Sequence, residues 1–370
     1  MKFIVILFIA ICSFLHLEGQ IYSLKPKSTL DKKVAETSGL ICVSGKFYTH
    51  GDSGDDAVLY EIDTLNGNVI RVLPIMGAHN IDWEEITSDD SFVYIGDFGN
   101  NSGMRKDLRI YKFRTDFLKL DTVFGVDTIL FQYQNQTGFS NKTYQTNFDA
   151  EAMFATDSCL FIFSKNWGNF KTYIYRCPKI KGQYQLNIID SINSMGLITG
   201  ACKSNVSSKI MLCGYTFNAP FVIECDSFLF PGYKNTIKRQ EYSAMGNIQI
   251  EAIAEVSKNR YFLTSEKLSA DQTLFDLNKL QVAGLQKLMG DGVDFKIAQI
   301  QNSKHIIWNS KYPIHHIQVV DFNGMIVRKN DTKDHVSGEI DLNNLATGVY
   351  LLRGITDFGA IVSMKFYLLE

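Results

Sequence analysis

The feature that most constrains this chain is a pattern of apolar and aromatic segments that recurs between about Pro26 and Leu280. Each unit has a small or acidic start, an apolar strand, an aromatic strand with a polar exit, and two more strands. The aligned starts are spaced 46, 67, 48 and 52 residues apart and fall at Ser38, Glu84, Glu151, Thr199 and Glu251. Four strands in about 50 residues match the strand number and length of one β-propeller blade. We therefore predict an all-β chain with a β-propeller over residues 21–284.

The repeats can be read strand by strand. First strands are expected at 36–43, 82–89, 149–156, 197–204 and 249–256. Fourth strands are expected at 69–75, 126–133, 184–190 and 236–243. The fifth repeat lacks one, and residues near Ile21–Leu30 are predicted to supply it and so close the ring. Five blades are visible; a sixth within the 67-residue interval or near 279–300 stays open, as does an all-β fold without radial repetition.

The composition sets the broad class of the protein. The chain has 370 residues, 37 Lys and Arg, 39 Asp and Glu, and 45% hydrophobic residues. This is ordinary globular composition, which excludes a disordered chain, a collagen-like repeat and a coiled coil. The formal net charge of −2 argues against a nucleic-acid partner, because such proteins carry a basic excess. We expect a monomer.

The N-terminus predicts a signal peptide over residues 1–20. Lys2 precedes the apolar run Phe3–Leu15, and a more polar exit follows. That run is too short for a transmembrane helix, which needs about 20 residues, and no other window is apolar enough to span a membrane. A buried first element, or a lipoprotein site at Cys12, are the alternatives.

The C-terminal stretch from 285 to 370 does not continue the four-strand repeat. It is predicted to be a small β-sandwich with short strands at 304–308, 314–322, 325–328, 337–342, 348–354 and 360–368. The tetrapeptide Asp321-Phe322-Asn323-Gly324 is a turn signal between two apolar strands.

Three blocks in this stretch carry a family resemblance. The segments IQVVDFNGMIV (317–327), IDLNNLATGVYLLR (340–353) and VSMKFYLLE (362–370) resemble the C-terminal sorting domain of the type IX secretion system of Bacteroidetes. The resemblance implies export across both membranes, with the type IX machinery as the partner of residues 285–370. It implies a secreted protein or one at the outer cell surface.

The repeat also places carboxylates at corresponding positions, which converge in a propeller. The starts of the first strands carry six: Glu36, Asp82, Glu84, Asp149, Glu151 and Glu251. Carboxylates around one axis repel each other unless a positive charge lies between them. A hard cation with oxygen ligands, most naturally Ca²⁺, would resolve this. Hydrogen bonds from backbone N–H groups of a neighbouring blade are the structural alternative, and a direct catalytic role is the third.

The exits of the second strands form a second candidate ring. They carry the mixed polar set His50, Asp52, Asp97, Asn100, Lys165, Asn166, Glu266 and Lys267. Such a mixture of charge suits a ligand-binding site. The segments 52–56 and 99–103 are also ordinary turn chemistry, and both interpretations stay open.

These motifs resemble a widespread family of secreted bacterial propeller proteins. The match spans most of residues 34–205, with ETSGL, NIDWEEI and YIGDFGNN among its blocks. The family is similar at a distance to calcium-dependent lactonase and gluconolactonase propellers and to esterase-like proteins. Gly51 stands where the family more often has Asn, and Glu85 where it often has Asp. The resemblance fits a ligand-binding propeller, or alternatively a metal-dependent hydrolase of esters, lactones or phosphoesters that uses the channel carboxylates.

Cysteines and other motifs add little. Six Cys lie beyond the predicted signal peptide, and Cys213 with Cys225 could pair on consecutive strands. No C-x-x-C pair, P-loop or G-x-S-x-G motif occurs. Trp83 and Trp167 lie near the two rings, where core packing is favoured over stacking on a ligand.

Overall fold

The computed structural model describes residues 22–226, 237–268, 270–279, 282–290, 293–300, 304–356 and 361–368. Within them the chain is built from strands, joined by the short 3₁₀ helices η1 (Lys32–Val34), η2 (Thr115–Lys119) and η4 (Ser243–Met245). None of the helices in these ranges is long and apolar enough to cross a membrane. The predicted signal peptide over 1–20 lies outside the described residues.

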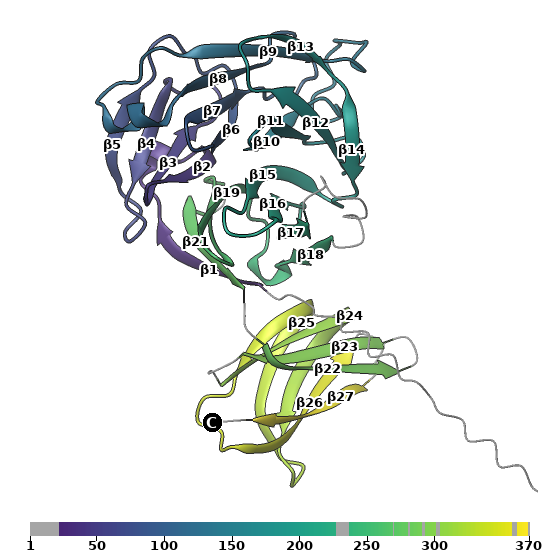
Figure 1. The fold of residues 1–370 in the computed structure, drawn as a ribbon. Coiled ribbons are helices and arrows are strands. Elements are labelled where there is room, and N and C mark those ends of the chain that lie inside the picture. Colours follow the sequence, from purple (N-terminus) through teal and green to yellow (C-terminus); the bar gives the residue numbers. More distant parts are fainter. Residues whose placement is uncertain are drawn as a thin grey trace, which may run out of the picture.

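Five sheets stand in a ring around a central axis, as expected for a β-propeller (Figure 1). The first two blades are β2 (Thr37–Val43), β3 (Lys46–Gly51), β4 (Val58–Ile62) and β5 (Val69–Pro74), then β6 (Trp83–Ser88), β7 (Phe92–Asp97), β8 (Arg109–Arg114) and β9 (Asp127–Tyr133). The next two are β10 (Ala150–Ala155), β11 (Cys159–Ser164), β12 (Thr172–Pro178) and β14 (Ile188–Ile192), then β15 (Leu197–Lys203), β16 (Lys209–Tyr215), β17 (Pro220–Asp226) and β18 (Lys238–Glu241). The last is β19 (Ile250–Ser257), β20 (Arg260–Ser265), β21 (Thr273–Lys279) and β1 (Tyr22–Thr29).

The hydrophobic core lies between neighbouring blades. Trp83 and Leu59 share a cluster from the first two blades, and further clusters join the second to the third, the third to the fourth and the fourth to the fifth. A last cluster joins Phe262 of the fifth blade to Phe47 of the first. Each inner strand also contacts the next, in the cyclic order β2, β6, β10, β15, β19 and back to β2. The packing therefore closes the ring.

The ring is locked by a strand from the N-terminus, which confirms the predicted role of residues near Ile21–Leu30. Strand β1 pairs antiparallel with β21 as the outermost strand of the fifth blade. At its start, the Tyr22 hydroxyl donates to the Glu224 carboxylate of the fourth blade, and Gln240 bonds the Tyr22 backbone. The buried Glu224 also pairs with Lys279 at 3.3 Å and Lys209 at 3.4 Å.

One predicted strand is wrong. Residues 184–190 were expected as the fourth strand of the third blade, but the chain divides there. Strand β13 (Gly182–Leu186) pairs in parallel with β9 at the edge of the second blade, and β14 alone completes the third. Tyr184 and Leu186 pack with the cluster between these two blades, so burial of this apolar pair favours the crossover.

The C-terminal residues form a separate six-stranded sheet with its own core around Trp308, Ile317 and Phe366. Its strands are β22 (Val282–Gly290), β23 (Val293–Ile300), β24 (His305–Val320), β25 (Ile326–Asp341), β26 (Gly348–Thr356) and β27 (Ile361–Leu368). The predicted boundary at 285 falls within β22.

The short C-terminal strands predicted at 304–308 and 314–322 are one strand, β24, and those at 325–328 and 337–342 are joined in β25. The break predicted between the strands at 304–308 and 314–322 is only a register shift, between Asn309 and Ile314, in a continuous strand pair. The turn after β24 is as predicted: the Gly324 N–H donates to the Asp321 carbonyl, and Gly324 has a φ of 83°.

The proposed pairing of Cys213 with Cys225 is not formed. Within the described chain the six cysteines are free thiols. Cys213 lies opposite Val222 and Cys225 opposite Ile210 in the β16–β17 pair, so the two sulfurs belong to different cross-strand pairs.

Replacing Tyr22 by Phe tests the ring closure. The hydroxyl bonds a buried carboxylate, and hydrogen bonds to charged groups contribute about 2 kcal/mol. We expect Tyr22→Phe to lower the free energy of unfolding by about 2 kcal/mol in urea denaturation. Tyr60→Phe on β4, a half-buried tyrosine, is the control and should change little. Equal stability of the two variants would contradict a closing role for Tyr22.

Candidate functional site

A β-bulge recurs at the same position in all five inner strands and creates the site. The strand register shifts between Thr37 and Leu40, Trp83 and Glu85, Ala150 and Ala152, Ile198 and Gly200, and Ile250 and Ala252. A bulge re-aims the side chain of the extra residue. The extra residues are the five aligned positions of the repeat, which we call the bulge ring: Ser38, Glu84, Glu151, Thr199 and Glu251.

The bulge ring has two kinds of member. The Ser38 hydroxyl donates to the Glu84 carbonyl of the next blade at 2.8 Å, and the Thr199 hydroxyl donates to the Ile250 carbonyl at 2.5 Å. These hydroxyls connect blades. The other three members are buried glutamates that line a cavity.

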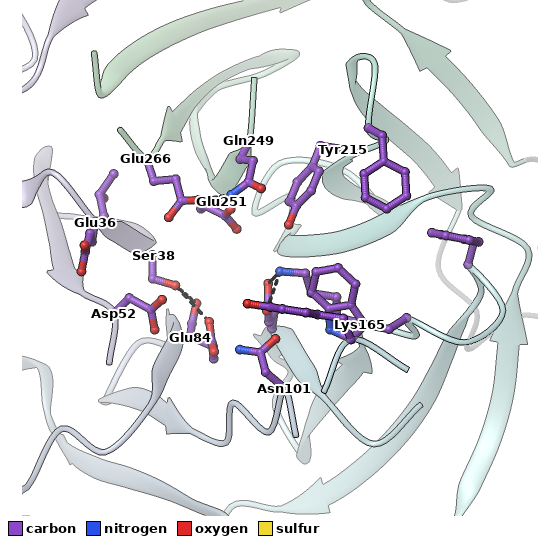
Figure 2. A pocket seen from close by; sticks show the side chains of 16 residues that line it. Glu36, Ser38, Asp52, Glu84, Asn101, Lys165, Tyr215, Gln249, Glu251 and Glu266 are labelled. Carbon is purple, nitrogen blue, oxygen red and sulfur yellow. Dashed lines mark hydrogen bonds and ion pairs between the residues drawn. The ribbon is translucent and has the colours of Figure 1, made fainter. Parts of the chain in front are cut away.

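That cavity, here the mouth cavity, has a volume of about 480 Å³. Figure 2 shows Glu36, Asp52 and Glu266 on one side of it and Lys165 and Tyr215 on the other. Its polar lining is Glu36, Thr37, Ser38, Asp52, Glu84, Asn101, Glu151, Lys165, Gln249, Glu251 and Glu266. Its aromatic lining is Tyr144, Trp167, Phe170, Tyr215 and Phe217.

Two overlapping groups of carboxylates meet at Glu84. One group is Asp52, Asp82 and Glu84, and the other is Glu84, Asp149 and Glu151; in each, the ligand oxygens lie within 4.8 Å of one another. Glu84 Oε1 is buried without a hydrogen-bond partner in the described structure. A Cβ on Gly99 would lie 2.1 Å from Glu84 Oε1 and 2.4 Å from Asp82 Oδ2, so a larger residue there would displace these carboxylates. The buried acidic cluster can hold a metal ion.

Burial and mutual repulsion raise the pKa values of these acids. Burial is the main cause for Glu84, whose pKa rises well above its usual range, with Asp52 and Glu151 adding repulsion. The same two causes raise the pKa of Asp82 to about 7, and burial raises that of Asp52 to about 6. The two carboxylate groups therefore carry more negative charge than nearby basic side chains offset.

Lys165 is the one basic side chain of the described lining, and Glu151 already holds it. Its Nζ lies 2.6 Å from Glu151 Oε1 and 2.5 Å from Oε2. The ammonium also lies over the rings of Trp167 at 4.9 Å and Tyr215 at 5.2 Å. A carboxylate and two aromatic faces thus bind one ammonium group in the wall of the cavity.

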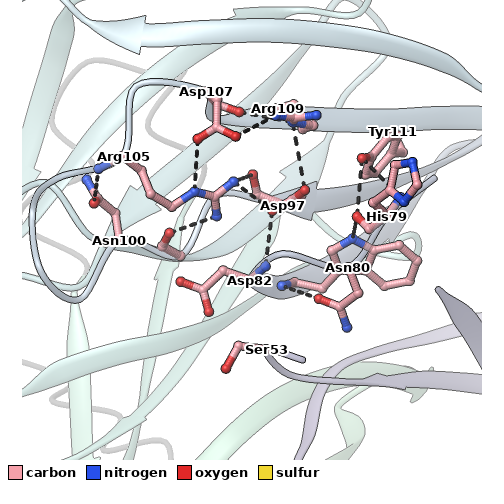
Figure 3. Close-up of polar contacts among 12 residues, drawn as sticks. Ser53, His79, Asn80, Asp82, Asp97, Asn100, Arg105, Asp107, Arg109 and Tyr111 are labelled. Carbon is pink, nitrogen blue, oxygen red and sulfur yellow. Dashed lines mark hydrogen bonds and ion pairs between the residues drawn. The ribbon is translucent and has the colours of Figure 1, made fainter. Parts of the chain in front are cut away.

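Two of the predicted carboxylates are anchored by the scaffold. Asp149 accepts the Asn100 N–H at 2.6 Å and the Trp167 indole N–H at 2.9 Å. Asp97 is paired with Arg105 at 2.8 Å, with Arg109 at 3.8 Å, and does not line the mouth cavity (Figure 3). Asp149 cross-links two blades as well as facing Glu84.

The predicted site residues divide between the cavity and its support. Glu36, Asp52, Glu84, Glu151, Lys165, Glu251 and Glu266 line the cavity, and Asp82 and Asp149 lie next to Glu84. The other predicted residues do not line the cavity. His50 is fully buried against Trp83, and Lys267 is exposed. The side-chain amides of Asn100 and Asn166 donate to the Phe148 carbonyl and to the Asn169 side chain, respectively. Burial lowers the pKa of His50 to about 4, so this imidazole is neutral.

The sequence prediction missed a residue on the axis, Glu85. Its Oε1 accepts the Ile86 N–H at 3.0 Å and its Oε2 accepts the Ala201 N–H at 3.0 Å. The backbone N–H groups of Leu40 and Met153 stabilise the same carboxylate. Burial raises the pKa of Glu85, and these four N–H groups oppose that rise.

The sequence does carry a signal for Glu85, at the position that directly follows the bulge-ring residue in each repeat. The other four repeats have small residues there: Gly39, Ala152, Gly200 and Ala252. A Cβ on Gly39 would lie 2.5 Å from the Ile86 nitrogen, and one on Gly200 would lie 3.0 Å from Ala252 Cα. The inner strands thus approach so closely that the axis has room for one large side chain.

The aromatic lining was also missed in part. Tyr144 comes from the loop that lengthens the second interval, and Phe170 and Phe217 come from loops after second strands. Single aromatic residues in loops carry no periodic signal. The favoured interpretation of Trp83 as a core residue fits its complete burial, whereas Trp167 lines the cavity.

Comparison with known proteins identifies the C-terminal part. Residues 299–366 match the family described as "Secretion system C-terminal sorting domain". The chain thus carries a type IX sorting domain, which indicates export to the medium or cell surface. No curated protein matches the chain.

Several solved structures are distantly similar to this chain. A glucose dehydrogenase has 9% identity and a TM-score of 0.42, over 69% of this chain and 98% of its own. An exo-β-1,3-galactanase from Phanerochaete chrysosporium has 10% identity and a TM-score of 0.43, over 94% of each chain. A hypothetical protein from Leishmania major has 12% identity and a TM-score of 0.41, over 69% of this chain and 90% of its own.

Replacing Glu85 by Gln tests the axial contact. The amide would present N–H groups to backbone N–H donors, and each buried donor left unpaired costs about 1–3 kcal/mol. We expect Glu85→Gln to lose about 3 kcal/mol of unfolding free energy, since two donors lose their acceptor. The exposed Glu36→Gln is the control, with little change. A fully stable Glu85→Gln would mean that the native side chain is a neutral acid rather than a fourfold acceptor.

Proposed function

We propose that this exported propeller binds a small ligand in its mouth cavity and holds a divalent cation, Ca²⁺ most naturally, at Glu84. The observation that carries the proposal is the buried Glu84, which belongs to both carboxylate groups and whose Oε1 has no hydrogen-bond partner in the described structure. Oxygen ligands of Ca²⁺ lie about 2.4 Å from the ion, so opposite ligands lie about 4.8 Å apart. Asp52, Glu84 and Glu151 also line the cavity, so a cation held by them would face a bound ligand.

Calcium titration tests the cation. After treatment with EDTA, we expect saturating Ca²⁺ to raise the melting temperature of the wild type by about 5 °C, because ligand at a hundredfold its Kd adds about 2.7 kcal/mol. Glu84→Gln should lose this response and melt higher than the wild type in EDTA, since it removes a repelled charge.

Two further variants sharpen the titration. Glu151→Ala should also lose the response, but it leaves Lys165 unpaired and so lowers stability as well. Glu255→Gln is the control, because Glu255 lies farther along β19 and bonds Ser204. An unchanged wild-type melting temperature in Ca²⁺ would eliminate the cation.

A metal-dependent hydrolase is the second candidate. It is favoured by the exposure of the Glu84 groups to the cavity, where an ion could polarise an ester, lactone or phosphoester. The test is hydrolysis of a lactone, an aryl ester and an aryl phosphate in Ca²⁺ and in EDTA. A rate that depends on Ca²⁺ and disappears in Glu84→Gln would favour the hydrolase over simple binding.

Deleting residues 282–370, the whole C-terminal sheet, tests whether this domain directs export. The tail has its own core, so we expect the remaining propeller to keep its melting temperature within about 1 °C, as separate clusters contribute independently. In the native host the shortened chain should no longer reach the medium or the cell surface, as followed by cell fractionation. Continued export would contradict a sorting role for this domain.

A further inference from the structure

The aromatic half of the mouth cavity is open to solvent. Tyr144, Phe170 and Phe217 expose 61%, 39% and 67% of their surface. The Tyr144 ring meets Trp167 edge-on at 4.8 Å, and Phe170 meets Phe217 edge-on at 6.1 Å. Exposed aromatic clusters beside a cavity are typical of binding sites, because they leave apolar surface in water.

Two of these rings are held at a conformational cost. Tyr144 has a φ of 55° and Phe170 a φ of 52°, in the left-handed region that bulky residues avoid. Such conformations cost about 1–3 kcal/mol and gather at functional sites. Backbone hydrogen bonds hold both, from Tyr144 to Asn101 at 3.1 Å and from Phe170 to Asn166 at 3.0 Å. The fold thus keeps the rings at the mouth against local preference.

The facing half of the cavity carries two acids, Glu251 and Glu266, that form no ion pair among the described residues. Glu251 is 7% exposed and lines the cavity, and among the described residues no contact shows a hydrogen bond or ion pair to its carboxylate. Its neighbour Glu266 accepts one hydrogen bond, from Gln249, and Glu36 is exposed at the rim. Burial is the main cause that raises the pKa of Glu251 to about 8 and that of Glu266 to about 7. Repulsion from Glu266 adds to the first and repulsion from Asp52 and Glu36 to the second, while Lys165 opposes both.

Lys165 is the one basic side chain of the described lining, and its attraction opposes the rise in the pKa of both acids without cancelling it. Lys165 is engaged by Glu151, and a divalent cation at Glu84 would be held by the acids of the neighbouring blades. A neutral hydroxylated ligand would leave the repulsion in place. A cationic ligand would remove it, as Lys165 already does between Glu151 and the rings of Trp167 and Tyr215.

We propose that the ligand of the mouth cavity is an organic ammonium compound, whose cationic group lies at Glu251 and Glu266 and whose body lies against the aromatic rings. This inference rests on the proposed function of the mouth as a ligand site. It names the charge and class of the ligand.

The test compares two molecules of the same shape. Choline is the cationic probe and 3,3-dimethylbutan-1-ol is its neutral carbon isostere, with glucose as a neutral hydroxylated probe. Binding is measured by calorimetry in saturating Ca²⁺ and by fluorescence of Trp167, the cavity-lining member of three tryptophans of which Trp83 and Trp308 are buried. We expect choline to bind at least tenfold more tightly than either neutral probe, with a fluorescence change that Trp167→Phe abolishes.

Matched variants locate the cationic group. Glu251→Gln keeps the shape of the side chain and should weaken choline binding at least tenfold without changing the melting-temperature response to Ca²⁺. Glu255→Gln, the same substitution on the same strand away from the cavity, should bind choline like the wild type.

The outcomes separate the two proposals. Equal binding of choline and its isostere, or tighter binding of glucose, would overturn the cationic class while keeping the mouth as a ligand site. No binding of any probe alongside a normal Ca²⁺ response would overturn the inference and leave the cation in place. Tight choline binding without a Ca²⁺ response would support the inference and remove only the cation.

Discussion

The carboxylate of Glu85 on the propeller axis is the contact on which the rest of the structure depends. It accepts hydrogen bonds from backbone N–H groups of the inner strands of four blades, each of which is the edge strand of its sheet. The small residues Gly39, Ala152, Gly200 and Ala252 let the strands come close enough for one side chain to reach them all. The bulges are thereby held at one height around the axis.

That common height explains how residues from distant repeats form one site. Glu84, Glu151 and Glu251 are far apart in the sequence, yet each is the extra residue of its bulge and faces the same cavity. Concentrating acids there costs stability, because burial and repulsion both disfavour their charged forms. The apolar clusters between blades and the Tyr22–Glu224 closure offset this cost away from the site. The stabilising contacts therefore lie farther from the propeller axis than the candidate site.

Much of this fold could be predicted from periodicity. The first strands, the closing strand near the N-terminus and the sorting tail all follow from local patterns and their spacing. The prediction failed at β13, because pairing with β9 depends on packing between blades rather than on residues 184–190 themselves. It failed in the tail at 309–314, because a polar segment looks the same whether it is a loop or a register shift in a long strand.

The sequence by itself determined the repeat, its register and the column of acids that lies at the mouth, since these depend on periodic positions that any ring must bring together. Only the tertiary structure decided which polar residues support the scaffold and which face the cavity. Asp97 and Lys165 occupy matching exits, yet one pairs with arginines outside the cavity and the other binds Glu151 in its wall. The reason is physical: a charge's role depends on the partners that folding places within a few ångströms, and those partners come from other blades and from loops that carry no period.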